Sequence, residues 1–286
     1  MKRSILSVVM VLLVCTGAYA ESSVWKVQKG KSVAYLGATF HLLRRTDYPL
    51  PPEFDKAYRA AAIIVFEADI NKLKEPATQL RLQTKAMYAD GSTVDKHLSA
   101  PAYEALRAYC ETSSFPLQEF SRYKPSILMV TLTLMELIKM GASRQGVDEY
   151  FYELATREKK VIEGLETVDE QIDYLVSMAD GNEDEFVTYS LRDMLTIRQQ
   201  FDSIVNAWRK GDAEKLDALL IAELKALQPK LYKKLITDRN RNWLSLIAAR
   251  QNQSRTRFIL VGMGHLVGPD GIIEALKKQG YKVDRL

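Results

Sequence analysis

The sequence predicts an α/β fold in which a mixed central sheet is flanked by helices, with a large helical layer inserted between the N-terminal and C-terminal halves of the sheet. Short β-branched and aromatic runs gather in the first and last parts of the chain, and helical periodicity dominates the middle. No linker rich in Gly, Ser or Pro separates these parts, so we expect residues 21–286 to form a single domain. With 286 residues, 47% of them hydrophobic, the chain can build a large core.

An export signal is predicted over residues 1–20. Lys2 and Arg3 form a charged start, an apolar run of about ten residues follows, and small residues up to Ala20 suit a signal peptidase. The apolar run is too short for a bilayer, which needs about 20 residues. We therefore expect cleavage after Ala20, no membrane span in the mature chain, and a periplasmic or secreted protein. An uncleaved anchor and a lipoprotein attached through Cys15 are the alternatives.

The N-terminal part predicts a hairpin, a helix and a third strand. Residues 24–28 and 32–39 flank a Lys-Gly-Lys turn, which is typical of a hairpin. Two prolines beginning at Pro51 open a helix, because proline is tolerated in the first helical turn. Residues 63–66 then form a short apolar run. Strand, helix and strand in such quick succession predict a right-handed parallel βαβ unit, with the carboxyl ends of both strands at one edge of the sheet.

The middle of the chain is predicted to be helical. Residues 182–210 carry apolar side chains at spacings of three and four, which indicates one long helix with a buried face. Another helix is expected from Pro229 to about Arg250. Thr167 and Glu170 fit a capping box, so Glu170 is expected to be structural. The other predicted elements are strands over 160–165, 257–261 and 281–284, and a short helix over 270–278.

The composition excludes several function classes. A net charge of +4 without a basic stripe argues against a nucleic-acid partner. Two cysteines exclude a disulfide framework and a Cys-rich zinc module. The chain has neither a His-Glu-x-x-His helix nor a Gly-x-Ser-x-Gly turn, so two common hydrolase plans are absent. The sequence leaves open whether the substrate is a peptide or another small molecule.

Polar side chains that could do chemistry follow four predicted strands: His41, Glu67, Glu166 and His265. Ligands of open α/β sheets bind beyond the carboxyl ends of the strands, so we expect these groups to gather. Both histidines follow a glycine, which permits positive φ and close approach of a ligand. Two imidazoles with one or two carboxylates form a ligand set for zinc, manganese or iron, and a further carboxylate could act as general base on a metal-bound water. The third histidine, His97, is expected in a solvated loop.

These residues resemble the TraB/GumN family, whose relatives include the Tiki peptidases and, more distantly, the erythromycin-esterase and ChaN-like proteins. Residues 262–265 match the second of the family's two Gly-x-x-His motifs. Residues 37–41 resemble the first motif, with the glycine one place early. The family's acidic residue matches Glu67, its Gly-Leu-Glu-Thr corner matches residues 164–167, and its Arg-Asn pair matches Arg239-Asn240. The resemblance extends over the whole expected mature chain.

The resemblance implies a metal-dependent hydrolase, with a peptidase as one candidate and Mn, Co or Zn as the divalent metal, and the export signal makes it a secreted one. It implies three metal ligands, His41, His265 and Glu67. It implies four catalytic residues, Glu67, Glu166, Arg239 and Asn240. Arg239 and Asn240 would steady a carboxylate or an oxyanion, and a salt bridge between helix and sheet is the alternative role of Arg239. Two other functions stay open: a ChaN-like protein that binds haem or a metal-bearing ligand without hydrolysis, and a metal-free hydrolase of esters or sugars with histidine as base.

Overall fold

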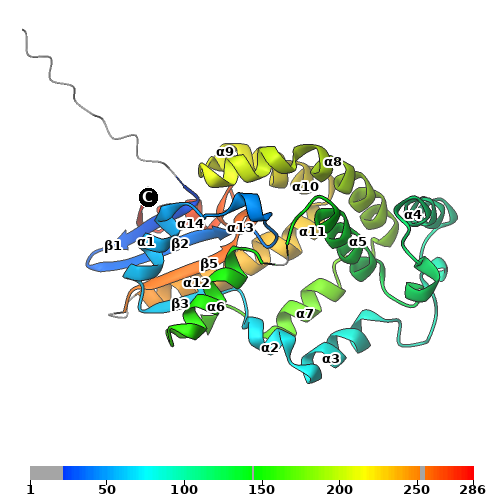
Figure 1. Cartoon of the computed structure of the whole chain (residues 1–286), viewed down its shortest axis with the longest axis horizontal. Helices are drawn as coiled ribbons and strands as arrows, with labels where there is room; N and C mark the ends of the chain where they lie inside the picture. Colours follow the sequence, from blue (N-terminus) through cyan, green and yellow to red (C-terminus); the bar gives the residue numbers. More distant parts are fainter. Residues whose placement is uncertain (1–21, 144, 252–254) are drawn as a thin grey trace, which may run out of the picture.

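The computed structural model describes residues 22–143, 145–251 and 255–286, so the predicted export signal lies outside the described residues. Across these ranges, six strands form one mixed sheet in the order β4-β3-β5-β2-β1-β6 (Figure 1). The predicted α/β fold with a mixed sheet flanked by helices is confirmed. The strands are β1 (Val24–Lys29), β2 (Ser32–Thr39), β3 (Ile63–Phe66), β4 (Val161–Gly164), β5 (Arg257–Gly262) and β6 (Lys282–Arg285).

The N-terminal and C-terminal strands interleave. Strands β1 and β2 form the predicted antiparallel hairpin, and β6 pairs antiparallel with β1. Strand β5 lies between β2 and β3 and is parallel to both. The predicted βαβ unit is therefore parallel, but its two strands are not neighbours. Strand β4 is parallel to β3, so the carboxyl ends of β2, β3, β4 and β5 all reach one edge of the sheet.

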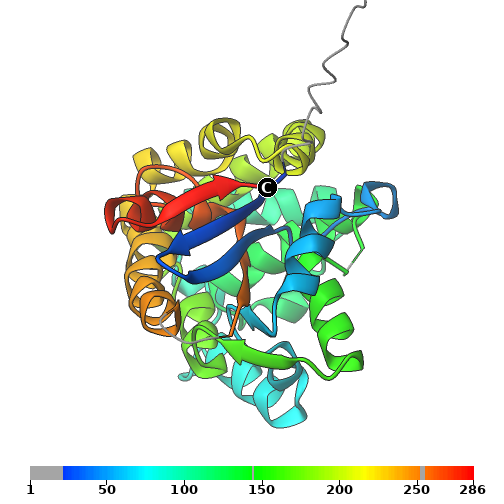
Figure 2. The same cartoon turned by 90° about the vertical axis from the view of Figure 1, so that its left-hand side faces the viewer.

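Helices cover both faces of the sheet (Figure 2). One face carries α1 (Pro52–Ala60) and α6 (Val147–Arg157), and the other carries α12 (Asp238–Gln251) and α14 (Ile272–Lys278). On the first face, Phe258 of β5 contacts Phe54 of α1 and Phe151 of α6, with ring centroids 6.3 Å and 5.7 Å apart. All three rings are fully buried, so this cluster fixes α1 and α6 against the strand that leads into the Gly-x-x-His segment.

The positive φ that glycine permits before each histidine is not adopted in the structure. Neither Gly37 nor Gly262 has positive φ, and Gly262 has a φ of −51°. Gly37 lies inside β2, where a Cβ atom would come within 2.7 Å of the Phe258 ring. The requirement at Gly37 is therefore close packing between neighbouring strands, which only a residue without a side chain permits.

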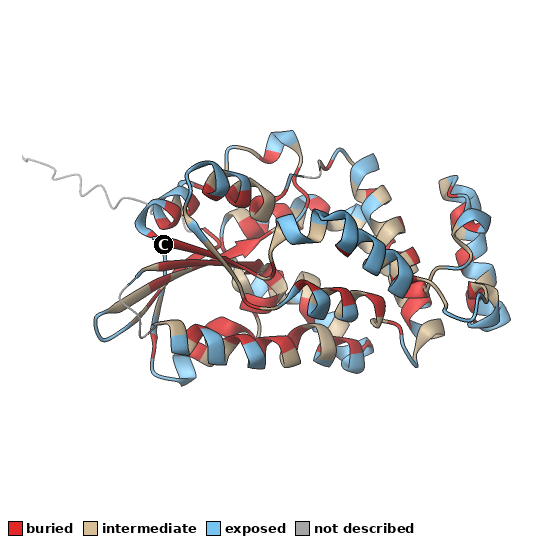
Figure 3. Ribbon diagram, turned by 90° about the horizontal axis from the view of Figure 1, so that it is seen from below, coloured by how far each residue is buried: buried red, intermediate tan, exposed pale blue. Residues whose placement is uncertain are grey.

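The helical layer extends beyond the carboxyl edge of the sheet. The predicted long helix is α8 (Glu183–Arg209), which connects two hydrophobic clusters. Trp208 near its end packs in the sheet core, whereas Phe186 and Met194 pack in a second cluster with α4 (Ala100–Ser113) and α5 (Pro125–Lys139). Figure 3 shows that buried residues follow the inward faces of these helices. No helix within the described ranges is both long and apolar enough to cross a membrane.

The helix predicted from Pro229 is continuous, but its winding changes along its length. It consists of α11 (Pro229–Tyr232), a π-helical segment over Lys233–Thr237, and α12. A second π segment covers Asp217–Ile221. Such wide turns are frequent at functional sites. The segment over Lys233–Thr237 is separated from the Arg-Asn pair by one residue, Asp238. The remaining α-helices are α2 (Ile70–Lys74), α3 (Pro76–Ala86), α7 (Val168–Val176), α9 (Ala213–Leu216), α10 (Ala222–Leu227) and α13 (Met263–Leu266).

Candidate active site

Arg239, in the first turn of α12, joins two carboxylates that follow neighbouring strands. Its Nη2 atom donates to Glu67 Oε2 at 2.7 Å and to Glu166 Oε1 at 2.5 Å, and its Nε atom donates to Glu166 Oε2 at 3.1 Å. All three side chains are nearly buried. The guanidinium also lies over the Trp243 ring, 4.6 Å from its centroid. Arg239 therefore forms the ion pair between helix and sheet that we named as its alternative role.

The two carboxylates differ in their tendency to ionise. Burial by itself favours the neutral form of Glu67, but the charges of Arg239 and His41 and a hydrogen bond from Gly262 N outweigh it and lower the Glu67 pKa to about 2. Burial raises the pKa of Glu166, and hydrogen bonds from Arg239 only partly oppose this rise. Glu67 is therefore the firmly charged partner of Arg239, and Glu166 takes up a proton more readily.

The hydrogen bonds around His265 define its tautomer. Asn240 Nδ2 donates to the carbonyl oxygens of His265 and Asp270 at 3.1 Å and 3.0 Å, so its Oδ1 atom faces His265 Nδ1 at 2.8 Å. An amide oxygen only accepts, so Nδ1 carries the proton and Nε2 accepts from Arg239 Nη1 at 3.1 Å. Burial lowers the His265 pKa to about 3. The charge of Arg239 acts in the same direction as burial, and the charge of Glu67 opposes both. His265 is therefore neutral at pH 7.

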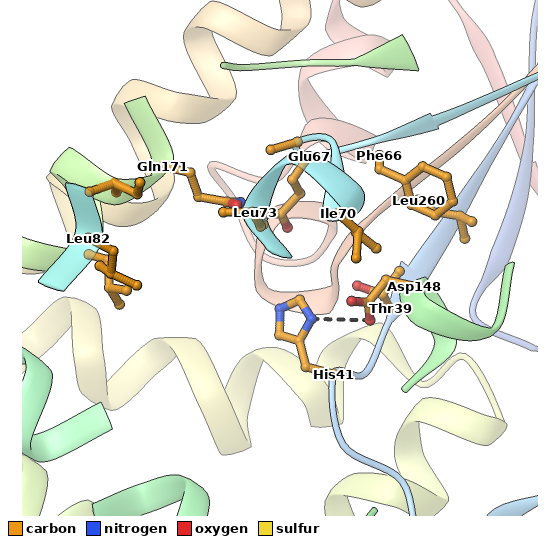
Figure 4. A pocket seen from close by; sticks show the side chains of 13 residues that line it. Thr39, His41, Phe66, Glu67, Ile70, Leu73, Leu82, Asp148, Gln171 and Leu260 are labelled. Carbon is orange, nitrogen blue, oxygen red and sulfur yellow. Dashed lines mark hydrogen bonds and ion pairs between the residues drawn. The ribbon is translucent and has the colours of Figure 1, made fainter. Parts of the chain in front are cut away.

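His41 follows β2 and lies across the cavity from Glu67, the one member of this network that the view labels (Figure 4). The His41 side chain is 64% exposed, its Nδ1 atom lies 3.2 Å from Asp148 Oδ1, and this carboxylate raises the His41 pKa to about 9. Its Nε2 atom points toward Gly262. A Cβ atom at Gly262 would lie 3.2 Å from Glu67 Oε1, 3.6 Å from His265 Cδ2 and 3.9 Å from His41 Nε2. The three side chains thus converge on a space that glycine leaves open.

Asp148 is a site residue that the sequence reasoning missed. It lies in the first turn of α6, and the chain before this helix is packed against the backbone of the His41 segment. Val147 N donates to Phe40 O at 3.0 Å, and a Cβ atom at Gly146 would come within 2.2 Å of the His41 carbonyl oxygen. These contacts fix Asp148 beside the imidazole. Acidic residues are common at helix starts, so nothing in the sequence distinguishes this one.

The predicted site residues come together, but the three predicted ligands are not arranged to hold a metal ion. Glu67 Oε1 accepts from Gly262 N at 2.7 Å, while Glu67 Oε2 and His265 Nε2 accept from Arg239. Of these ligands, only His41 has a ring nitrogen without a hydrogen bond to another described residue. Over the described ranges, no group of three or more His, Cys, Asp or Glu side chains could hold a metal ion. Arg239 supplies the positive charge that a cation would otherwise provide, so the residues as placed do not fit a metal.

A cavity of about 380 Å³ opens beside His41 and Glu67 (Figure 4). Its walls are mainly apolar and come from the end of β3 and from α2, α3 and α7. Its polar lining residues are Thr39, His41, Glu67, Asp148 and Gln171. The third histidine, His97, belongs to a surface loop as expected, where it stacks on Tyr88 with the ring centroids 3.6 Å apart. The site therefore combines a polar network with an adjoining apolar space.

Comparison with known proteins identifies the family of this chain. The model of the TraB/PrgY/gumN family matches residues 23–285. The chain is also similar to a protein named "Metalloprotease TIKI homolog" from Amphimedon queenslandica, with 30% identity over 40% of this chain and 24% of the relative. The chain thus spans about a quarter of that relative's length. No solved structure matches the chain. Because the family model covers nearly the whole described chain, the protein belongs to the TraB/PrgY/gumN family.

Proposed function

We propose that this protein is a hydrolase that cleaves peptide bonds at the carboxyl edge of its sheet. The observation that carries the proposal is the position of the His41–Asp148 pair. The pair faces the buried network of Glu67, Arg239 and His265 at the mouth of an apolar cavity. A relative named as a metalloprotease supports the choice of a peptide substrate.

In this proposal His41 is the general base. Asp148 accepts the Nδ1 proton, which leaves Nε2 free to take a proton from water. Glu67 faces the same space beside Gly262, so a water molecule there would have one acceptor on each side. His41 must be neutral to act as a base. Because its pKa is about 9, we expect activity to rise with pH through the neutral and mildly alkaline range.

A metal-dependent form of the same hydrolase is the second candidate, and the relative's name favours it. His41, Glu67 and His265 would bind a divalent ion such as Mn²⁺, Co²⁺ or Zn²⁺. Arg239 already donates to His265 Nε2, which has a single lone pair, so this contact and metal ligation by that nitrogen exclude each other. The carboxylate of Glu67 keeps further lone pairs beside its bond from Arg239, so metal binding by all three residues requires the guanidinium to release His265.

One experiment tests both candidates. The protein is purified without chelator, its metal content is measured, and hydrolysis of a quenched-fluorescence peptide library is followed with EDTA or with each added metal. His41→Ala should lose most of the activity, whereas His97→Ala, which alters an exposed loop histidine, should retain it. Activity that survives EDTA supports the metal-free form. Activity that needs an added metal supports the second candidate.

Absence of hydrolysis under every condition would contradict both forms. In that case, a Soret shift on addition of haemin would favour the alternative of a ChaN-like binding protein.

We also propose that the protein is exported to the periplasm or the medium after cleavage at Ala20, on the basis of the sequence of residues 1–20 alone.

A further inference from the structure

The apolar wall of the cavity beside His41 has no part in the proposed mechanism. The cavity volume of about 380 Å³ lies within the range of small-molecule sites, roughly 300–1,000 Å³. At liquid density it would hold about a dozen water molecules. Four aliphatic side chains line the wall away from the strand ends: Leu73, Leu82, Ile172 and Leu175. Water against such a wall finds few hydrogen-bond partners, so an apolar group that displaces it gains free energy.

The helices that form this wall contribute little to the main core. Helix α2 has no buried residue, and α3 buries only Thr78 and Ala86. The two helices are attached to their neighbours by ion pairs, including Lys74–Glu149 to α6 and Arg81–Asp169 to α7. Leu73 of α2 and Leu82 of α3 pack instead against a small separate cluster with α7. Leu73 and Leu82 therefore present apolar surface to the cavity.

A second and independent observation comes from Thr39, which lines the same cavity. Its side chain is 2% exposed, and its Oγ1 atom has no hydrogen-bond partner among the described residues. A buried hydroxyl without a partner is uncommon and unfavourable. Figure 4 shows Thr39 close to Asp148, on the His41 side of the cavity, whereas Leu82 and Gln171 lie at the opposite end. A ligand amide or carbonyl group beside His41 would satisfy this hydroxyl.

We propose that this cavity is a specificity subsite for a bulky aliphatic or aromatic side chain of a peptide, whose backbone hydrogen-bonds to Thr39. The inference rests on the proposed hydrolase function and names the substrate class. A peptide suits the cavity because it brings an apolar side chain and amide groups together. A hydrocarbon chain fills the wall but offers far fewer groups to the polar end.

Calorimetric titration at pH 7 with EDTA tests the subsite independently of hydrolysis. The two probes are N-acetyl-Gly-Gly-Phe-Gly-Gly-amide and the same peptide with Ser in place of Phe. Burying the phenylalanine ring should make the first probe bind about 10- to 100-fold more tightly. Leu82→Ser should reduce this preference several-fold. Leu80→Ser, on the same helix but 64% exposed, is the matched control and should leave it unchanged.

Thr39→Val removes the hydroxyl at nearly constant volume, so it should weaken both peptides about equally and preserve their ratio. Equal binding of the Phe and Ser peptides would overturn the proposal, as would equal effects of the Leu82 and Leu80 substitutions. Decanoate that displaces the Phe peptide and binds more tightly would overturn it in favour of an acyl-chain ligand. Selective binding without any hydrolysis supports the subsite and contradicts the proposed function, whereas hydrolysis without a preference for Phe overturns the subsite alone.

Discussion

His265 should make the folded protein sensitive to acid well above the pH at which carboxylates titrate. Its pKa is about 3 in the folded chain, whereas the pKa of an unperturbed histidine side chain is 6.5. As the pH falls below 6.5, the His265 imidazole becomes protonated in the unfolded chain but stays neutral in the folded chain. The unfolded state then binds more protons, so the free energy of unfolding decreases as the pH falls. This loss begins near pH 6.5 and continues toward pH 3.

The size of the effect follows from these two pKa values. Between pH 7 and pH 5, His265 should remove about 2 kcal/mol from the free energy of unfolding. Its side chain is 6% exposed, so solvent screens the effect little. The loss is a substantial fraction of the stability of a typical domain, which is about 5–15 kcal/mol.

Urea unfolding followed by tryptophan fluorescence at pH 7, 6 and 5, with EDTA present, measures this effect. His265→Gln removes the titrating group, and His97→Gln changes an exposed histidine as the control. The stability difference between the unmodified protein and the His265 variant should shrink by about 2 kcal/mol from pH 7 to pH 5. His41 titrates in all three proteins. Glu67 makes the free energy of unfolding depend on pH only below about pH 4.5. Parallel pH dependences of the unmodified protein and His265→Gln over this range would refute the reasoning.

Three further predictions concern charge and processing. Arg239→Met should lower the free energy of unfolding by about 3–5 kcal/mol, because it leaves two carboxylates without their buried partner. Urea unfolding measures the loss, and Arg241→Met, at an exposed side chain, is the control. If both substitutions lower the free energy of unfolding by the same small amount, the ion-pair network is contradicted. Asp148→Asn should lower the His41 pKa and move the rising limb of the pH–rate profile to lower pH, and proton NMR titration of the imidazole checks the cause. An unmoved His41 pKa would exclude the electrostatic role of Asp148. Amino-terminal sequencing of the exported protein should begin at Glu21, and an intact Met1 would contradict cleavage.

The sequence was sufficient to predict which strand ends come together. Parallel strands share their carboxyl edge, so His41, Glu67, Glu166 and His265 were bound to gather once their strands were recognised. The order of strands was not predictable in the same way. Insertion of β5 between β2 and β3 depends on pairing between residues far apart in the chain, and hydrophobic periodicity records only the local period.

Three features of the site depend on contacts that local patterns do not contain. Gly37 is required by the Phe258 ring, which comes from a neighbouring strand late in the chain. Asp148 reaches His41 only because the loop before α6 packs on the His41 backbone. The π segment over Lys233–Thr237 lies just before Arg239, and a search for the 3.6-residue helical period does not reveal such a turn. In each case the residue type was visible in the sequence, but its partner was set by tertiary packing.

The same distinction explains why the donor set alone did not define a metal centre. A histidine at a strand end is a metal ligand only if the lone pair of its ring nitrogen stays free, and that depends on what the rest of the fold places beside it. Here Arg239, 172 positions from Glu67, donates to two of the three expected ligands and is itself packed on Trp243. One guanidinium offers a single positive charge to two carboxylates, whereas a divalent ion would offer two. Experiments that test for a metal at this site should therefore vary Arg239 together with the histidines.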